Sequence, residues 1–108
     1  MSSMFTLWIR DDATGAERTM DLPTFQVGRE TGMTIGSAPG VDVVLPGPSV
    51  APKHVRAVAL SNHKTITALA PGVSVLELSV KPGSERRVDN REFEVGSFTL
   101  RFGEREVG

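Results

Sequence analysis

Hydrophobic and polar residues alternate along most of this chain in short stretches with a period of two. The clearest are residues 5–10 (FTLWIR), 73–80 (VSVLELSV) and 92–102 (EFEVGSFTLRF). Since successive side chains of a strand point to opposite faces, each stretch predicts a strand with one buried face, the last one being two strands about a Gly96-Ser97 turn. Less regular stretches predict further extended segments at residues 18–22, 25–28, 33–35, 41–45, 55–60 and 65–69.

Glycine, proline, asparagine and aspartate separate these stretches at intervals of about 8–12 residues. No stretch shows the helical period of about 3.6 residues. The pattern therefore predicts an all-β sandwich. We expect a single domain over residues 1–108, with its core at about residues 4–103 and a frayed, charged tail at residues 104–108.

The composition argues against several classes of function. The chain has 12 basic and 13 acidic residues and no basic cluster larger than Arg86-Arg87, so no nucleic-acid partner is expected. It has no cysteine, and therefore no disulfide framework or thiolate metal site. No apolar run is long enough to span a membrane. No nucleophile, acid–base pair or phosphate loop stands out, which predicts a non-catalytic protein without a cofactor, a metal or a small-molecule substrate.

The most distinctive segment is residues 35–54 (IGSAPGVDVVLPGPSVAPKH). Gly36 permits a close or left-handed backbone that a side chain would block. Residues 38–40 (APG) predict a turn, because proline presets φ and glycine accepts a positive φ. The prolines at 46, 48 and 52 cannot donate to a strand ladder, so this passage must cross an edge or an end of a sheet.

This segment resembles the forkhead-associated (FHA) domain, a phosphothreonine-reading β-sandwich with the usual pattern I-G-R-x-x-x-N-D-I-x-L-x-x-x-x-V-S-R-x-H. Aligned without a gap, the matching positions are Gly36, Asp42, Val43, Leu45, Val50 and His54. The family's closing G-D-x-I-x-x-G segment is similar to residues 96–103, so the resemblance covers about residues 4–103. It implies an FHA-like β-sandwich of about ten to eleven short, mostly antiparallel strands.

The side chains that grip phosphate in the family are replaced in this chain. Ser37 stands where the family has an arginine, Ala51 where it has the phosphate-binding serine, and Pro52 where an arginine follows. Pro71 replaces the asparagine that holds the main chain of the ligand. The resemblance thus implies a degenerate FHA domain, which keeps the frame and lacks the phosphothreonine-binding residues.

Three of the retained residues are expected to be structural. In the family the histidine braces the loop from inside, which implies this role for His54 beside Gly36. We expect Asp42 to accept hydrogen bonds within its own loop. Lys53 and Arg56 are the side chains that could replace the phosphate grip or contact another partner; otherwise they are solvated surface charges. The alternative function is therefore a signalling FHA domain that still reads phosphothreonine peptides through a shifted site.

One branch of the family is similar at these same departures. The cytoplasmic domain of the type III secretion inner-membrane ring protein (YscD/PrgH type) has G-S-D-P-x-x-D-I-V-L followed by A-P-x-H. This chain has G-S-A-P-G-V-D-V-V-L at residues 36–45 and A-P-K-H at residues 51–54. The resemblance implies a scaffold module on the cytoplasmic face of the bacterial inner membrane. Its protein partners would be the cytosolic sorting-platform adaptor or neighbouring ring subunits, and the full-length protein would have one membrane helix soon after residue 108.

Overall fold

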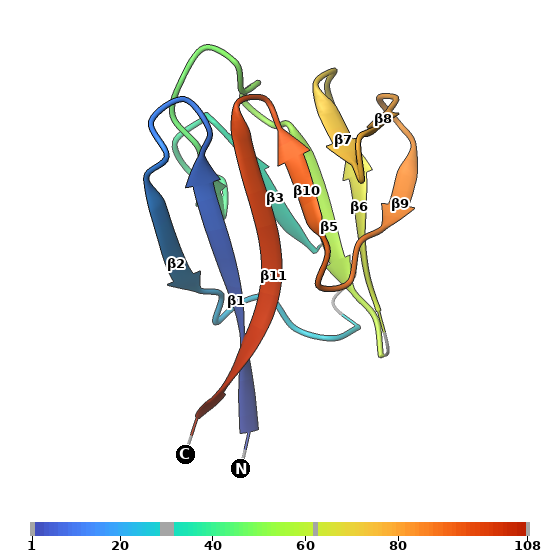
Figure 1. The fold of residues 1–108 in the computed structure, drawn as a ribbon. Helices are drawn as coiled ribbons and strands as arrows, with labels where there is room; N and C mark the ends of the chain where they lie inside the picture. Colours follow the sequence, from blue (N-terminus) through green and yellow to red (C-terminus); the bar gives the residue numbers. More distant parts are fainter. Residues whose placement is uncertain (1, 29–31, 62, 108) are drawn as a thin grey trace.

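Two β-sheets pack face to face, and the inward-facing side chains of their strands form the core (Figure 1). The structure is a computed structural model that describes residues 2–28, 32–61 and 63–107. In these residues it contains eleven strands and no helix, so the prediction of an all-β sandwich is confirmed. The strands are β1 (Ser2–Asp11), β2 (Glu17–Asp21), β3 (Met33–Gly36), β4 (Val43–Val44), β5 (Val55–Ala59), β6 (Lys64–Ala68), β7 (Val73–Val75), β8 (Leu78–Val80), β9 (Glu85–Arg87), β10 (Glu92–Val95) and β11 (Phe98–Val107).

The first sheet has six strands in the order β2-β1-β11-β10-β7-β8, and the second has five in the order β4-β3-β5-β6-β9. Strands β3 and β4 pair in parallel, and the other neighbouring strands of the described chain pair antiparallel, as predicted. The chain passes from one sheet to the other after β2, β6, β8 and β9. Loops that are far apart in the sequence therefore meet at the same end of the sandwich.

A row of phenylalanine rings covers part of the inner face of the six-stranded sheet. The ring of Phe25, in the connection between β2 and β3, lies 5.2 Å from Phe5 and 5.3 Å from Phe102. Phe102 of β11 in turn stacks at 5.6 Å on Phe93 of β10. Each fully buried ring removes about 150–250 Å² from water, so this row contributes to the core and packs the β2–β3 connection against the sheet.

The stretch at residues 73–80, predicted as one strand, is two strands joined by a tight turn. Leu76 and Glu77 form this turn with φ angles of 52° and 68°. A two-residue hairpin loop with two positive φ angles usually contains asparagine and glycine, and neither residue marks the turn here. Val80 points into the core as expected, whereas Leu78 is 72% exposed.

Three other predictions need correction. Residues 85–87, where the pattern predicted no strand, form the edge strand β9. Residues 41–45 supply only the short strand β4, and residues 25–28 contribute a single bridge between Val27 and Ala59. The predicted frayed tail is wrong for residues 104–107, which continue β11 in register with β1; Gly108 lies outside the described residues.

The strands β1 and β11 run past the rest of the first sheet as a two-stranded ribbon, and both chain termini lie at its end (Figure 1). We call this the ribbon end. The connections β3–β4, β4–β5, β6–β7 and β10–β11 lie at the opposite end, which we call the loop end. In the described part of the chain, no helix has the length and apolar character needed to cross a membrane.

Candidate functional site at the loop end

The loop end brings together the positions that the sequence singled out. Two main-chain hydrogen bonds join the β3–β4 loop to the proline-rich β4–β5 loop: the N–H of Ser37 donates to the carbonyl of Ala51 at 2.9 Å, and that of Ala38 to Pro52 at 3.2 Å. The β6–β7 loop lies beside them, because Gly72 approaches the ring of His54. Residues that are distant in sequence thus form one continuous surface.

Gly36 is required by the close approach of these two loops. A Cβ atom at this position would overlap the carbonyl oxygen of Pro52 and crowd that of Ala51. The carbonyl of Gly36 also accepts a hydrogen bond from the N–H of Leu45 at 2.8 Å. The glycine therefore allows β3 to support the start and the end of the proline-rich loop at once.

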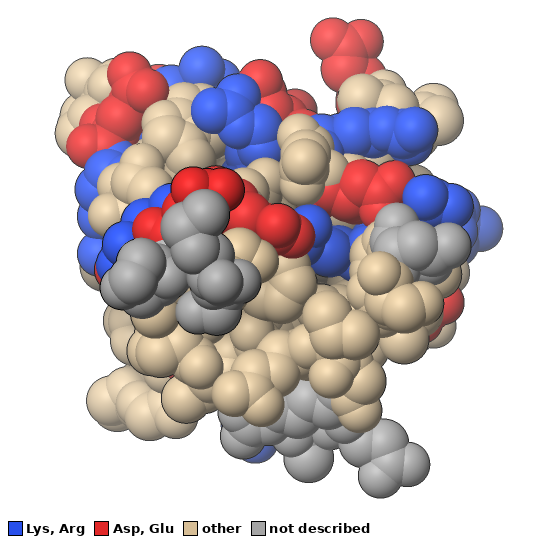
Figure 2. All heavy atoms as spheres, turned by 90° about the horizontal axis from the view of Figure 1, so that it is seen from below, with Lys and Arg blue, Asp and Glu red and all other residues tan. Residues whose placement is uncertain are grey.

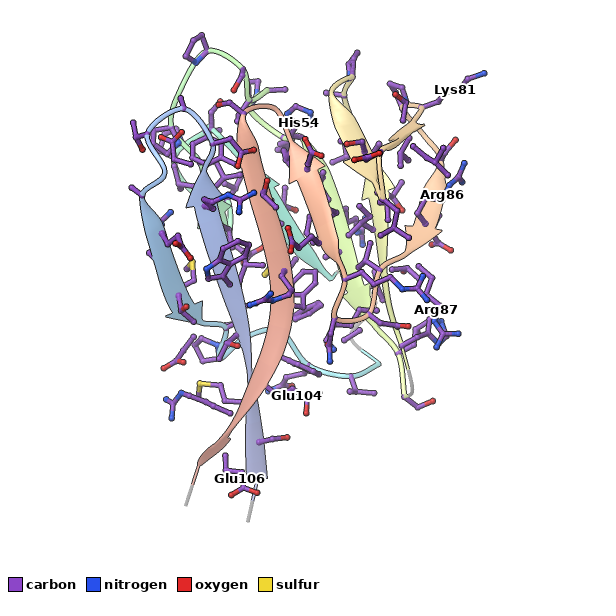
Figure 3. All side chains as sticks on the ribbon, viewed as in Figure 1. His54, Lys81, Arg86, Arg87, Glu104 and Glu106 are labelled. Atoms are coloured by element: carbon purple, nitrogen blue, oxygen red, sulfur yellow. The ribbon has the colours of Figure 1, made fainter. Side chains whose placement is uncertain are left out.

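His54 is buried beneath the loops and connects all three of them (Figure 3). Its Nδ1 accepts a hydrogen bond from the N–H of Ala51 at 3.0 Å. The main-chain N–H of His54 donates to the carbonyl of Ile35 at 2.9 Å, and its main-chain carbonyl accepts from the N–H of Leu69 at 2.8 Å. This is the geometry of a brace.

The hydrogen bond to Nδ1 places the proton of the neutral ring on Nε2. Among the described residues, no group completes a hydrogen bond to Nε2. Burial lowers the pKa of His54 below its ordinary value, and the main-chain carbonyl of Pro71 beside the ring offsets part of that shift. Neutral His54 is therefore the form that matches the folded loops, because protonation would remove the acceptor for Ala51.

Asp42 and a pair of serines hold the outer parts of the loops. The Oδ2 atom of Asp42 accepts a hydrogen bond from the N–H of Thr34 at 2.9 Å, so it ties its loop to β3 rather than bonding within the loop. Ser49 Oγ lies 3.0 Å from Ser97 Oγ and accepts from the N–H of Ser97 at 3.1 Å. Sequence reasoning missed Ser49, since a contact across 48 positions leaves no local pattern.

The four positions of the family's phosphate grip offer few donors here. Ser37 is half-buried, and its N–H is already bonded. Ala51, Pro52 and Pro71 carry no side-chain donor, and proline has no N–H. Five of the chain's seven prolines lie in the connections at this end and are exposed: Pro39, Pro46, Pro48, Pro52 and Pro71. These positions add no main-chain N–H donor to the surface.

Lys53 and Arg56 do not form one site with the four positions of the family's phosphate grip. Lys53 is exposed in the β4–β5 loop. Arg56 is on β5, opposite Thr34 of β3 and Thr67 of β6, so it belongs to the outer face of the five-stranded sheet. Among the described residues, no three His, Cys, Asp or Glu side chains are grouped closely enough to hold a metal ion.

Comparison with known proteins identifies the architecture. No protein-family model and no curated protein matches this chain by sequence. Among solved structures, the FHA domain of the CT664 protein from Chlamydia trachomatis is similar, with a TM-score of 0.70, 21% identity and coverage of 92% of this chain and 95% of that one. A domain solved in a study of phosphothreonine-dependent FHA interactions has a TM-score of 0.69 and 20% identity, covering 96% of this chain and 99% of that one.

EmbR from Mycobacterium tuberculosis, solved with a low affinity phosphopeptide, has a TM-score of 0.67 and 21% identity. The match covers 90% of this chain and 24% of the EmbR chain. All three similarities extend over nearly the whole sandwich described above. The chain has the fold of a forkhead-associated domain.

Proposed function

We propose that this chain is a non-catalytic protein-interaction module, a degenerate FHA domain whose loop end binds a protein partner without reading phosphothreonine. The single observation that carries the proposal is the use of donors at the loop end. The N–H groups of Ser37, Ala38 and Ala51 all bond within the loops. The side-chain donors that the family places around phosphate are absent at the matching positions.

The binding free energy lost with these contacts decides whether the domain binds phosphothreonine weakly or not at all. A hydrogen bond to a charged group contributes roughly 1.5–3 kcal/mol. Losing the arginine, the serine and the asparagine would cost on the order of 4–5 kcal/mol, or about a thousandfold in affinity. Lys53 alone, exposed and mobile about its long side chain, does not replace three positioned donors.

The second candidate is a signalling domain that binds phosphothreonine peptides through a shifted site. The similar structures favour it, since one comes from a study of phosphothreonine-dependent interactions and another contains a phosphopeptide. Such a site would have to use Lys53 in the β4–β5 loop and Arg56 on the outer face of β5. Only Lys53 of this pair lies at the loop end, because Arg56 is on the outer face of the five-stranded sheet.

The finer proposal is that the chain is the cytoplasmic domain of a type III secretion inner-membrane ring protein. It is supported by the paired replacements in G-S-A-P (residues 36–39) and A-P-K-H (residues 51–54), which match that branch of the family. The partner would be the sorting-platform adaptor on the cytoplasmic side, and the full gene would encode one membrane-spanning segment soon after residue 108. A full-length sequence that instead continues into an ATPase or DNA-binding region would contradict this assignment.

A photo-crosslinking residue at Lys53 in the native cells tests the interaction directly, with the same residue at Arg101 on the outer face of β11 as the control. We expect a crosslink from position 53, and none from position 101, to a cytosolic component of the secretion apparatus. The crosslink should survive treatment of the lysate with phosphatase before irradiation. A crosslink that disappears after phosphatase treatment would favour the signalling alternative.

A further inference from the structure

A lysine side chain near the ribbon end is buried beside a carboxamide and a carboxylate. Lys64 begins β6, and its side chain is 10% exposed. Its Nζ atom lies 3.3 Å from Oδ1 of Asn90 and 3.9 Å from Oε1 of Glu104. The ring of Phe5 lies beneath it, with 5.0 Å between Nζ and the ring centre. Three reactive groups from separate parts of the fold therefore meet over an aromatic ring.

The main chain fixes the position of Asn90 relative to Lys64. The carbonyl of Lys64 accepts hydrogen bonds from the N–H groups of Val88 at 2.8 Å and Asp89 at 3.2 Å. The N–H of Lys64 donates to Oδ1 of Asp89 at 3.1 Å, and Arg87 donates to the other oxygen of that carboxylate at 2.8 Å. The turn that carries Asn90 is thus fastened to the same residue that its side chain meets.

The group is shielded on one side and open to water on the other. Asn90 is exposed, and the side chain of Glu104 is 49% exposed. A hollow of about 260 Å³, lined by Lys64, Asn90 and Glu104 among others, opens at this point. Figure 2, which views the molecule from the ribbon end, shows acidic and basic side chains side by side on part of this face. A small product formed here could leave directly into solvent.

We propose that Lys64 and Asn90 form an intramolecular isopeptide bond, with Glu104 as the proton acceptor. The carboxylate of Glu104 takes a proton from the ammonium of Lys64, and the free amine attacks Cγ of Asn90. The Nζ–Cγ bond forms, and the Cγ–Nδ2 bond breaks after Nδ2 has gained a proton. The new amide is neutral, and the proton that the lysine brought leaves with ammonia as an ammonium ion. The step needs no oxidant, reductant or activating co-reactant.

The fold supplies proximity in place of an activated acyl group. An unactivated carboxamide reacts very slowly with an amine in water, and holding the two groups in contact makes the attack intramolecular. Oδ1, at 3.3 Å from Nζ, is bonded directly to the carbon under attack, so a small rotation of the Asn90 side chain brings the reacting atoms together. Escape of ammonia makes the reaction one-way. This inference does not depend on the phosphate-independent function proposed above.

The intact mass of the purified natural domain tests the proposal. After prolonged incubation at neutral pH, the denatured chain should weigh one ammonia molecule less than its sequence. Protease digestion should then give a branched peptide that joins the segments containing Lys64 and Asn90. A chain that keeps the full mass of its sequence would overturn the proposal.

Variants that remove one reactant each identify the source of the ammonia. Lys64→Met and Asn90→Ala should both keep the full mass of their sequences. Asparagine can also lose ammonia by closing on its own main chain, and that reaction does not need the lysine. A loss of ammonia that persists in Lys64→Met would therefore overturn the proposal.

A matched pair of glutamine variants tests the proton acceptor. Glu104→Gln keeps the shape of the side chain and removes its basic oxygen, so the loss of ammonia should be at least about tenfold slower. Glu106→Gln makes the same change two residues further along β11 and should leave the rate unchanged. Equal rates in the two variants would contradict the role of Glu104.

The stability of the two forms gives an independent readout. The reacted chain has one positive charge fewer, so ion exchange separates it from the unreacted chain. The bond closes a loop between residues 26 positions apart, which restricts the unfolded chain as a disulfide does. The reacted form should unfold at a temperature about 10 °C or more higher. Equal unfolding temperatures would show that no bond between these segments had formed.

Discussion

The loop end and the ribbon end of this sandwich use their polar groups in opposite ways. At the loop end, main-chain N–H groups bond to carbonyls and to His54 across three loops, and five prolines are among the exposed residues. At the ribbon end, Lys64 is nearly buried, 3.3 Å from Asn90, 3.9 Å from Glu104 and over the ring of Phe5. The loop end thus bonds its main-chain donors across loops, whereas the other end buries a charged side chain against an aromatic ring.

This contrast teaches where to look for binding when a fold is retained and its ligand residues are replaced. The frame at the loop end depends on backbone geometry, which a glycine and a buried histidine can maintain without any phosphate contact. Side chains that remain outside this frame, such as Leu78, are free to vary without loss of the fold.

Restoring the family's residues should convert the loop end into a phosphate site. In the combined variant Ser37→Arg, Ala51→Ser, Pro52→Arg and Pro71→Asn, phosphothreonine peptides should bind about a thousandfold more tightly than to the natural chain. Isothermal calorimetry measures the difference, with unphosphorylated peptides as the control. A folded variant that binds no better than the natural chain would show that features other than these four side chains prevent phosphothreonine binding.

Two glycine substitutions separate steric overlap from backbone strain. Gly36→Ala should destabilise the domain by about 3 kcal/mol or more, because its Cβ would overlap the Pro52 carbonyl. Gly40→Ala, where φ is 95° and no atom lies within 4 Å of the added Cβ, should cost only about 1 kcal/mol. Denaturant unfolding measures both values. Equal losses of stability would mean that the two loops move apart to accommodate the added Cβ atom without a cost in free energy.

Protonation of His54 should weaken the loop end in mild acid. The pKa of His54 is lowered in the folded protein by burial, so the unfolded chain binds the proton first as the pH falls below about 6.5. The contribution of neutral His54 to the stability of the fold is present in full above that pH and is lost as the pH falls through the folded-state pKa. In His54→Leu, which should cost about 1–3 kcal/mol at neutral pH, the loss of stability that begins as the pH falls below about 6.5 should be smaller. An unchanged profile in the variant would assign this dependence to other groups.

The strained hairpin should become more stable when it receives the usual turn residues. Replacing Leu76 and Glu77 with Asn and Gly should stabilise the domain by about 1 kcal/mol, since both positions have positive φ angles. Thermal unfolding measures the gain, and Leu78→Asn, outside the turn, is the control. No gain would mean that the left-handed backbone is not under strain.

Most of the fold could be predicted because its strands have one buried face. The alternation at residues 5–10 and 92–102 identified β1, β10 and β11. Strand β9 was missed because all three of its residues are exposed, so it carries no alternation. The turn at Leu76 was missed because its left-handed geometry lacks glycine or asparagine, and the pairing of residues 104–107 because charges dominate that segment.

The sequence could also identify the positions of the loop end, through Gly36, His54 and the replaced phosphate residues. It could not show how those loops close, because the contacts of Ser49 with Ser97 and of Ser37 with Ala51 join segments without any shared pattern. A hollow at the ribbon end was likewise hidden. Its lining, which includes Phe5, Phe25 and Val27, looks like ordinary core sequence until the fold brings β1 and the β2–β3 connection together.

Titration of the natural domain with phosphothreonine peptides and matched unphosphorylated peptides shows whether the loop end binds phosphate. Because the loop-end donors bond internally and the family's phosphate residues are replaced, we predict no phosphate-dependent heat in isothermal calorimetry. A peptide library that covers varied residues after the phosphothreonine makes the result general. Phosphate-dependent binding in the micromolar range would contradict the account and would place this domain among phosphothreonine readers.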